Sequence, residues 1–210
     1  MKRFALAGAV ALALAYAATP SQAQTEAAKP PPAGLAVATF AAGCFWCTEA
    51  DFDKVAGVVS TTSGYTGGHK ANATYHEVGT GRTGHTEGVR VVYDPKKVTY
   101  AKLLDVYWRT VDPYDGRGQF CDKGSQYRPE IFTHDAEQKK LADASKAAVE
   151  AKLKRPVVVK VTPAPAFYVA EDYHQDYYTK NPVRYKFYRY NCGRDARLEQ
   201  VWGSAAAPTN

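Results

Sequence analysis

The chain has 210 residues, of which 45% are hydrophobic and 23% are charged, and its formal net charge is +6. The basic residues are spread along the chain instead of gathered in a block, so the charge favours neither a nucleic acid nor a membrane as partner. The four cysteines are too few to be the main covalent support of a domain this long, and redox chemistry explains them better than a disulfide framework.

The first 23 residues have the pattern of a secretory signal peptide. Lys2 and Arg3 precede an apolar run over residues 4–18, and residues 21–23 offer small side chains at the cleavage position. The apolar run is shorter than the roughly 20 residues of a membrane-spanning helix, which favours cleavage over retention as a membrane anchor. We therefore expect an exported protein, located in a bacterial periplasm, with no membrane association after cleavage.

The remaining chain is expected to hold one domain. Residues 24–34 are alanine, proline and polar residues, a composition that predicts a disordered leader. Residues 35–203 form the expected catalytic domain, and residues 204–210 are expected to be a flexible tail. No internal repeat is present, and the length left after cleavage is within reach of a single domain.

Local patterns predict alternating strands and helices. Strands are expected at residues 35–42, 58–68, 85–93, 130–134 and 157–161, and helices at residues 45–55, 99–111 and 135–153. Residues 71–84 and 114–128 contain glycines without a sustained period, and long loops in compact domains are usually functional. We expect an α+β fold, a two-layer α/β sandwich with a ferredoxin-like core, a mixed sheet and long functional loops.

Cys44 stands where the first strand is expected to turn into the first helix. Gly43 allows a sharp turn, and the free N–H groups at a helix start lower the pKa of a thiol from about 8.5, which favours the nucleophilic thiolate. Phe45 and Trp46 would form an apolar wall suited to a methyl or thioether group. The alternative is that Cys44 is a small buried core residue.

Cys47 follows Cys44 by one helical turn. Side chains at this spacing lie roughly 5–6 Å apart at Cβ, so Cys47 could resolve an oxidised Cys44 by forming a disulfide. A zinc site is disfavoured because Cys121 and Cys192 are single and no second pair completes four ligands. No metal and no other cofactor is expected.

Glu87 lies on the clearest predicted strand. His85, Glu87, Val89, Val91 and Tyr93 share one face of residues 85–93. If that face packs on the core, burial keeps the carboxyl neutral near pH 7 and makes it a proton donor. The alternative is an acid on an edge strand that faces water.

Several motifs together resemble the A type of peptide methionine sulfoxide reductase. The resemblance runs from about Val37 to Gly203 and preserves the order of the motifs. The motifs are Gly43-Cys44-Phe45-Trp46 with Glu49, Gly64-Tyr65-Thr66-Gly67-Gly68, Thr74-Tyr75, Thr83-Gly84-His85-Thr86-Glu87, Tyr93-Asp94-Pro95, Asp122-Lys123-Gly124-Ser125-Gln126-Tyr127-Arg128 and Ala170-Glu171-Asp172-Tyr173-His174-Gln175.

The resemblance implies a reaction on methionine S-sulfoxide, free or in proteins. Cys44 is then the nucleophile that attacks the sulfoxide sulfur, which leaves a sulfenic acid on Cys44 and releases methionine. Glu87 is the acid that protonates or hydrogen-bonds the sulfoxide oxygen. This role agrees with the expected burial of Glu87, which keeps its carboxyl group protonated, because a sulfoxide is a poor electrophile until its oxygen gains a proton.

The resemblance also implies the substrate pocket. Phe45 and Trp46 match the family's pocket for the substrate methyl group. Tyr75 and Tyr127 match two phenols directed at the sulfoxide oxygen, and Asp122 matches a supporting carboxylate.

Regeneration of Cys44 requires a second thiol. The usual resolving thiols of the family lie near the C-terminus, where Cys192 stands, so Cys192 is favoured and Cys47 is the second candidate. Cys121 is expected to be structural. The resulting disulfide needs a low-potential dithiol donor, and a thioredoxin-like protein is the natural one. We expect a monomer.

Two other functional classes fit parts of the sequence. An exported C-x-x-C at a helix start also suits a thioredoxin-like dithiol oxidoreductase, although that function leaves Glu87, Tyr75 and Tyr127 without a role. The segment 173–194 is rich in tyrosine, lysine and arginine and could bind single-stranded nucleic acid, but it is better explained as a cover over the active-site loop. His85 and His174 are expected to support the structure.

Overall fold

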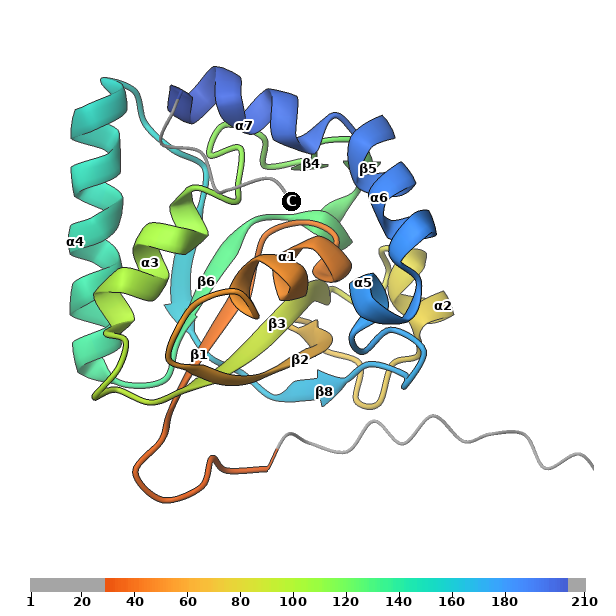
Figure 1. The fold of residues 1–210 in the computed structure, drawn as a ribbon, viewed down its shortest axis with the longest axis horizontal. Coiled ribbons are helices and arrows are strands. Elements are labelled where there is room, and N and C mark those ends of the chain that lie inside the picture. The colour runs from red at the N-terminus through yellow and green to blue at the C-terminus, as the bar shows by residue number, and fades with distance from the viewer. Residues whose placement is uncertain (1–28, 204–210) are drawn as a thin grey trace, which may run out of the picture.

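A computed structural model describes residues 29–203 (Figure 1). The expected signal peptide, residues 24–28 of the expected leader and the expected tail lie outside these residues. Within them, strands and helices alternate along one chain, as the sequence predicts for an α+β fold. None of the helices in this range is long and apolar enough to cross a membrane.

The centre of the fold is a mixed sheet of six strands. Its order is β7-β6-β1-β3-β2-β8, and only the β6–β7 pair is parallel. The elements β1, α1, β2, β3, α3 and β6 follow one another with strand order β6-β1-β3-β2, which is the split βαβ arrangement of ferredoxin-like folds. The strands are β1 Ala36–Ala41, β2 Val58–Thr66, β3 Thr86–Tyr93, β6 Glu130–Thr133, β7 Lys160–Pro163 and β8 Phe167–Val169.

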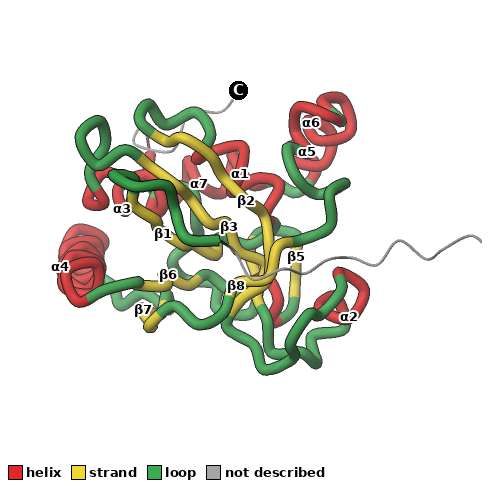
Figure 2. The backbone as a smooth tube through the Cα atoms, turned by 90° about the horizontal axis from the view of Figure 1, so that it is seen from below, coloured by secondary structure: helices red, strands yellow, loops and turns green. Residues whose placement is uncertain are grey.

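Helices α1 and α3 pack against the central strands, and α4 packs beside α3 and β6 (Figures 1 and 2). Helices α2, α5 and α6 lie on one side of the molecule in both views. The helices are α1 Phe45–Phe52, α2 Tyr75–Gly79, α3 Tyr100–Trp108, α4 Ala136–Leu153, α5 Tyr177–Lys180, α6 Pro182–Asn191 and α7 Arg194–Trp202.

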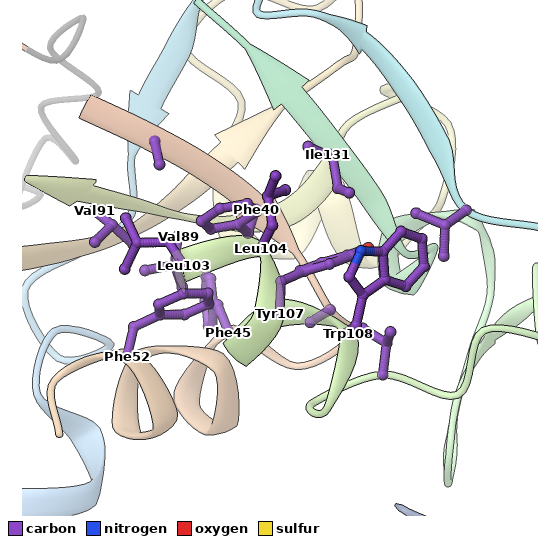
Figure 3. Packing of buried hydrophobic residues seen from close by; sticks show 14 of the residues in the cluster. Phe40, Phe45, Phe52, Val89, Val91, Leu103, Leu104, Tyr107, Trp108 and Ile131 are labelled. Atoms are coloured by element: carbon purple, nitrogen blue, oxygen red, sulfur yellow. The ribbon is translucent and has the colours of Figure 1, made fainter. Parts of the chain in front are cut away.

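An aromatic stack fills the space between the sheet and the helices (Figure 3). The ring centroid of Phe40 on β1 lies 4.9 Å from that of Phe52 on α1 and 5.2 Å from that of Tyr107 on α3. All three rings are fully buried, and burying such a side chain contributes about 1.5–3 kcal/mol to the free energy of unfolding. This stack fixes α1, and with it the turn that carries Cys44, against β1.

The sequence predicts that one face of β3 is buried, but side chains on both faces are buried. Glu87, Val89 and Val91 are buried as expected, but Thr86 and Val92 on the opposite parity are buried too. The cause is that β3 is a central strand, paired with β1 on one side and β2 on the other. An exposed Glu87 on an edge strand is thereby excluded.

Several predicted elements differ from the observed ones. The strand expected at residues 157–161 begins only at Lys160, where pairing with Glu130 starts, and Val158 is 45% exposed. The loop expected at residues 71–84 contains α2, which begins with a capping box between Thr74 and Glu77.

The second expected loop is also partly ordered. Residues 114–128 contain a two-stranded hairpin of β4 Gly118–Gln119 and β5 Asp122–Lys123, followed by a 3₁₀ turn at Ser125–Tyr127. This hairpin lies between the end of α3 and β6 in the chain, and its turn carries Cys121.

Candidate active site

The turn between β1 and α1 places Cys44 at the N-terminal end of α1. Gly43 has a φ of +84°, a backbone conformation that favours glycine, and a Cβ at this position would lie 2.6 Å from Cβ of Gln119. Cys44 is the N-cap residue of α1, and its carbonyl oxygen accepts hydrogen bonds from the N–H groups of Cys47 and Thr48 at 3.2 and 3.3 Å. The sequence prediction of a thiol at a strand-to-helix turn is confirmed.

The pKa of the Cys44 thiol is raised, whereas its position at a helix start predicts a lowered pKa. Burial raises the pKa of the Cys44 thiol well above its ordinary value, and a hydrogen bond with Cys47 and the nearby carboxyl groups raise it further. The first N–H group of α1, that of Phe45, donates its hydrogen bond to Glu87 Oε2 at 2.9 Å and not to the sulfur of Cys44. Cys44 is therefore a protonated thiol in this state.

Glu87 is the second residue of β3, and its side chain contacts the start of α1. The residue is 2% exposed, and burial raises the pKa of its carboxyl well above the usual range, against the opposing effect of the Phe45 N–H. Among the described residues, none hydrogen-bonds Glu87 Oε1. A neutral carboxyl group at this position can donate a proton to a bound molecule.

Tyr75 and Tyr127 approach the same carboxyl from two different segments. Tyr75 begins α2, and Tyr127 ends the 3₁₀ turn; both are half-buried. Burial and the proximity of Glu87 raise the pKa of Tyr75 to about 12 and raise that of Tyr127 as well, so both phenols remain protonated donors at neutral pH. The structure brings these two residues together with Cys44 and Glu87.

Phe45 and Trp46 are held by a segment far along the chain. The ring centroid of Phe45 lies 4.9 Å from that of His174, and Trp46 Nε1 donates to His174 Nδ1 at 3.0 Å. The indole of Trp46 also stacks on Tyr177 with centroids 3.7 Å apart. Burial lowers the pKa of His174 to about 4, so its ring is neutral and able to accept this hydrogen bond.

Glu171 belongs to the sequence motif at residues 170–175 and joins two walls of the site. Its carboxylate accepts from Tyr65 O–H at 2.7 Å and from the backbone N–H of Tyr75 at 2.9 Å. The contact ties the start of α2 to the segment that holds Trp46. Sequence reasoning missed this contact because the two residues are 96 positions apart.

His85 has a structural place, as expected. Its Nδ1 accepts from the N–H of Gly68 at 3.1 Å, and its Nε2 lies 2.7 Å from the carbonyl oxygen of Lys70. Both nitrogens are therefore occupied by the loop that precedes α2.

Asp122 lies in β5 and is bound by a tyrosine of α6. Tyr188 O–H donates to Asp122 Oδ2, and burial raises the pKa of the Asp122 carboxyl. The negative charge of Asp122 contributes to the raised pKa of both Cys44 and Glu87. Asp122 is thus a neighbour of the thiol and the acid, and Tyr188 is a further neighbour that the sequence did not single out.

The four cysteines form two different pairs. Cys121 and Cys192 are joined by a disulfide, whereas Cys44 and Cys47 are free and buried. Cys192, the favoured resolving residue, is therefore not a free thiol in this state, and Cys121 is its bonded partner. The sulfurs of Cys121 and Cys192 lie near the Asp122 carboxyl, but because they are bonded to each other they are not available as metal ligands.

A neutral buried acid, two phenols and two free thiols within one α+β domain define a cysteine-dependent oxidoreductase. Comparison with known proteins identifies which one. The family model described as "Peptide methionine sulfoxide reductase" matches residues 36–206. The chain therefore belongs to the peptide methionine sulfoxide reductase family.

Relatives and solved structures agree with this family. The MsrA of Listeria monocytogenes serotype 4a is 48% identical over 170 residues, which are 80% of this chain and 96% of the relative. MsrA 2 of Caulobacter vibrioides is 46% identical over 204 residues, covering 97% of this chain and 100% of the relative. The crystal structure of Mxr1 from Saccharomyces cerevisiae in reduced form is 34% identical, covers 73% of this chain and 90% of that chain, and has a TM-score of 0.69.

Proposed function

We propose that this protein is a peptide-methionine (S)-S-oxide reductase that converts methionine S-sulfoxide, free or in proteins, to methionine. One observation carries the proposal: the buried Cys44 thiol adjoins Glu87, a carboxyl group that burial keeps neutral and whose second oxygen has no partner among the described residues. A nucleophilic sulfur beside a proton donor is what an unactivated sulfoxide requires.

In the first step, the substrate methyl group lies against Phe45 and Trp46, and the sulfoxide oxygen points to Glu87. Tyr75 and Tyr127 donate hydrogen bonds to the same oxygen. The sulfur of Cys44 attacks the sulfoxide sulfur, the S–O bond of the substrate breaks, and the oxygen passes to the Cys44 sulfur as a sulfenic acid. The thiol proton of Cys44 replaces the proton that Glu87 gives to this oxygen. The substrate sulfur gains the two electrons that the Cys44 sulfur loses, and methionine leaves.

In the second step, a thiol displaces the oxygen of the Cys44 sulfenic acid as water and forms an intramolecular disulfide. Cys192 and Cys47 are the candidates, and Cys192 is bonded to Cys121 in the state described here. A thioredoxin-like dithiol donor then reduces the protein, because thiol–disulfide exchange returns both cysteines to thiols. Cys121 is exposed, so such a donor can also reduce the Cys121–Cys192 disulfide, which returns Cys192 to a thiol.

An assay with a dithiol reductant and the two sulfur epimers of methionine sulfoxide tests the function. The wild type is expected to turn over the S epimer, and Cys44→Ser is expected to lose turnover. Glu87→Gln removes the proton donor and is expected to lower kcat/KM by about a hundredfold or more. Glu137→Gln, an exposed acid on α4, is the matched control and keeps full activity. Turnover of the R epimer alone, or full activity of Cys44→Ser, would contradict the proposal.

We also propose that the protein is exported to a bacterial periplasm after cleavage of residues 1–23 and works there as a monomer. Support comes from the sequence pattern of the first 23 residues. N-terminal sequencing of the protein purified from its native cell should begin at Gln24. An intact N-terminus in the membrane fraction would instead show a retained anchor.

A further inference from the structure

Cys121, Asp122 and Cys192 bring three metal-binding atoms to one place. The two sulfurs and a carboxylate oxygen of Asp122 all lie within 4.8 Å of one another. The sequence disfavours zinc because Cys121 and Cys192 are each single in their segments, but the fold brings the turn between β4 and β5 to the end of α6. Three protein ligands with a water in the fourth position make an open zinc site.

The disulfide decides whether the two sulfurs are ligands. In the state described here Cys121 and Cys192 are bonded to each other, so neither sulfur is a thiolate. A dithiol donor breaks this S–S bond by giving it two electrons and two protons, and the donor itself becomes a disulfide. Zn²⁺ that binds the reduced pair displaces the two thiol protons, because zinc takes cysteine as thiolate.

The distances around Cys192 are close to those of a tetrahedral zinc site. Its Sγ lies 3.8 Å from Oδ2 of Asp122. Zinc–sulfur bonds of about 2.3 Å and zinc–oxygen bonds of about 2.1 Å, at a tetrahedral angle, place sulfur and oxygen about 3.6 Å apart. The Cα atoms of Cys121 and Cys192 lie 4.8 Å apart, so rotation of the exposed Cys121 side chain separates the sulfurs once their bond is broken.

Hydrogen bonds orient two of the three ligands. Tyr188 O–H donates to Asp122 Oδ2, and the backbone N–H of Cys121 donates to Cys192 Sγ at 3.2 Å. Outer hydrogen bonds of this kind hold metal ligands in place, and an N–H group directed at sulfur favours the thiolate. The set therefore has both its ligands and the contacts that support them.

Charge and access also fit a bound cation. Zn²⁺ cancels two of the three negative charges of two thiolates and a carboxylate, and the positive charges of Arg194 and Lys123 act on Asp122 from nearby. Cys121 is exposed, and Asp122 and Cys192 are half-buried, so an ion can enter from solvent.

We propose that Cys121, Asp122 and Cys192 form an open zinc site in the reduced protein, and that the Cys121–Cys192 disulfide abolishes it. The ligands are two thiolates, one carboxylate oxygen and a water. The inference is independent of the proposed function, because neither Cys44 nor Glu87 is a ligand. Bound zinc withholds Cys121 and Cys192 from disulfide exchange until the ion leaves.

Cobalt binding tests the site, because Co²⁺ replaces Zn²⁺ in tetrahedral thiolate sites and absorbs visible light there. The full chain is reduced with a phosphine, the reductant is removed without oxygen, and the protein is titrated with Co²⁺. The reduced wild type is expected to bind about one ion per molecule, with a thiolate-to-cobalt absorbance that Zn²⁺ abolishes. The wild type with its disulfide intact is expected to show no such absorbance.

Two tyrosines of α6 give a matched pair of variants. Tyr188→Phe removes the O–H group that orients Asp122 and is expected to weaken the affinity for Zn²⁺ about tenfold or more. Tyr190→Phe, at an exposed position of the same helix, is the control and keeps the affinity of the wild type. Asp122→Asn removes the charge of a ligand and is expected to weaken binding at least as much as Tyr188→Phe.

Cysteine variants separate this site from the thiols of α1. Cys44 and Cys47 are also free in the reduced protein, so the Cys44→Ser, Cys47→Ser double variant must keep the cobalt absorbance, and Cys192→Ser must lose it. The proposal is overturned if the reduced wild type binds no Co²⁺, if the absorbance persists in Cys192→Ser, or if the double variant loses it. Should Cys192→Ser not fold, wild-type affinity in both Tyr188→Phe and Asp122→Asn overturns the proposal as well.

Discussion

Glu49 is a buried carboxyl group of α1 that the proposed chemistry does not use. It is 1% exposed, and its Oε2 accepts the backbone N–H of Asp176 at 3.0 Å. Burial, and then the charges of Asp53 and Asp176, raise its pKa from 4.5 to about 7. Between these two values the folded protein keeps a proton that the unfolded chain has lost, so the free energy of unfolding falls as pH rises.

Glu49→Gln removes this titration. The stability of the variant relative to the wild type is expected to rise by about 3 kcal/mol between pH 4.5 and pH 7, because each pKa unit corresponds to about 1.4 kcal/mol. Chemical denaturation at several pH values measures the difference. Glu137→Gln, an exposed acid, should show no such trend, and a pH-independent difference for Glu49→Gln would contradict the assigned pKa.

At this scale the sequence predicted residues that act through local pattern and missed those that act through distant contacts. Cys44 was found because Gly43 and the two aromatic residues adjoin it. Glu171 is 96 residues from Tyr75, and only the folded chain brings its carboxyl group to the backbone N–H of Tyr75. The raised pKa of Cys44 was missed because it follows first from burial, which only the folded chain produces. In addition, Glu87, which is 42 residues from Phe45, accepts the Phe45 N–H.

The turn between β1 and α1 is the element on which the site depends. An alanine at position 43 must adopt a φ of +84°, which costs about 1–2 kcal/mol, and its Cβ would lie 2.6 Å from Cβ of Gln119. The Gln119 side chain cannot yield easily, because its amide is anchored to the backbone of Asp112. Gly43→Ala is therefore expected to lower the free energy of unfolding by about 2–4 kcal/mol and to reduce turnover.

Gly79→Ala is the control for this substitution. A Cβ at Gly79 meets no atom within 4 Å, and its φ is not in the left-handed region. Its stability should equal or slightly exceed that of the wild type in thermal unfolding. Equal behaviour of the two alanine variants would show that the tight approach at Gly43 is not required.

Helix α4 is structural and lies away from the thiols. Its N-cap Asp135 accepts the backbone N–H of Gln138 at 2.7 Å. Asp135→Ala is expected to cost about 1 kcal/mol in chemical denaturation without changing kcat/KM. Asp143→Ala, which removes an exposed ion pair with Lys139 on the same helix, should change stability by less than about 0.5 kcal/mol. A loss of kcat/KM in Asp135→Ala would contradict the separation of α4 from the site.

The sequence predicted those strands and helices that show one clear local hydrophobic pattern. The β3 strand was found from alternation, and the helix at residues 135–153 closely matches α4. Short elements inside loops were missed: α2 depends on the Thr74–Glu77 capping box, and the β4–β5 hairpin includes Phe120 at a positive φ. Neither feature produces a hydrophobic period.

On the scale of the whole molecule, the Cys121–Cys192 disulfide joins the hairpin loop to the end of α6 across 71 residues. Closing a loop of this length restricts the unfolded chain by about 4 kcal/mol in the chain-entropy treatment. The Cys121→Ser, Cys192→Ser double variant should therefore unfold at a lower denaturant concentration than the oxidised wild type. Reductant should bring the wild type to the same midpoint, and coincident midpoints without reductant would show that the disulfide does not support the fold.

The fold class and the family could be predicted from sequence, because the motifs extend over nearly the whole domain. The pairing of Cys121 with Cys192 could not be predicted, since each cysteine is single in its own segment and only the packing of α6 against the hairpin brings them together. For the same reason, the sequence alone does not decide whether Cys47 or Cys192 resolves the Cys44 sulfenic acid.

The most direct test of the central claim is a single turnover of Cys47→Ser, with the Cys121–Cys192 disulfide intact and without reductant, in the presence of dimedone. The proposed chemistry predicts that the S epimer of methionine sulfoxide yields about one methionine per protein molecule and a trapped sulfenic acid on Cys44. Methionine release without a dimedone adduct on Cys44, or no release at all from the folded variant, would contradict the assignment of Cys44 as the nucleophile.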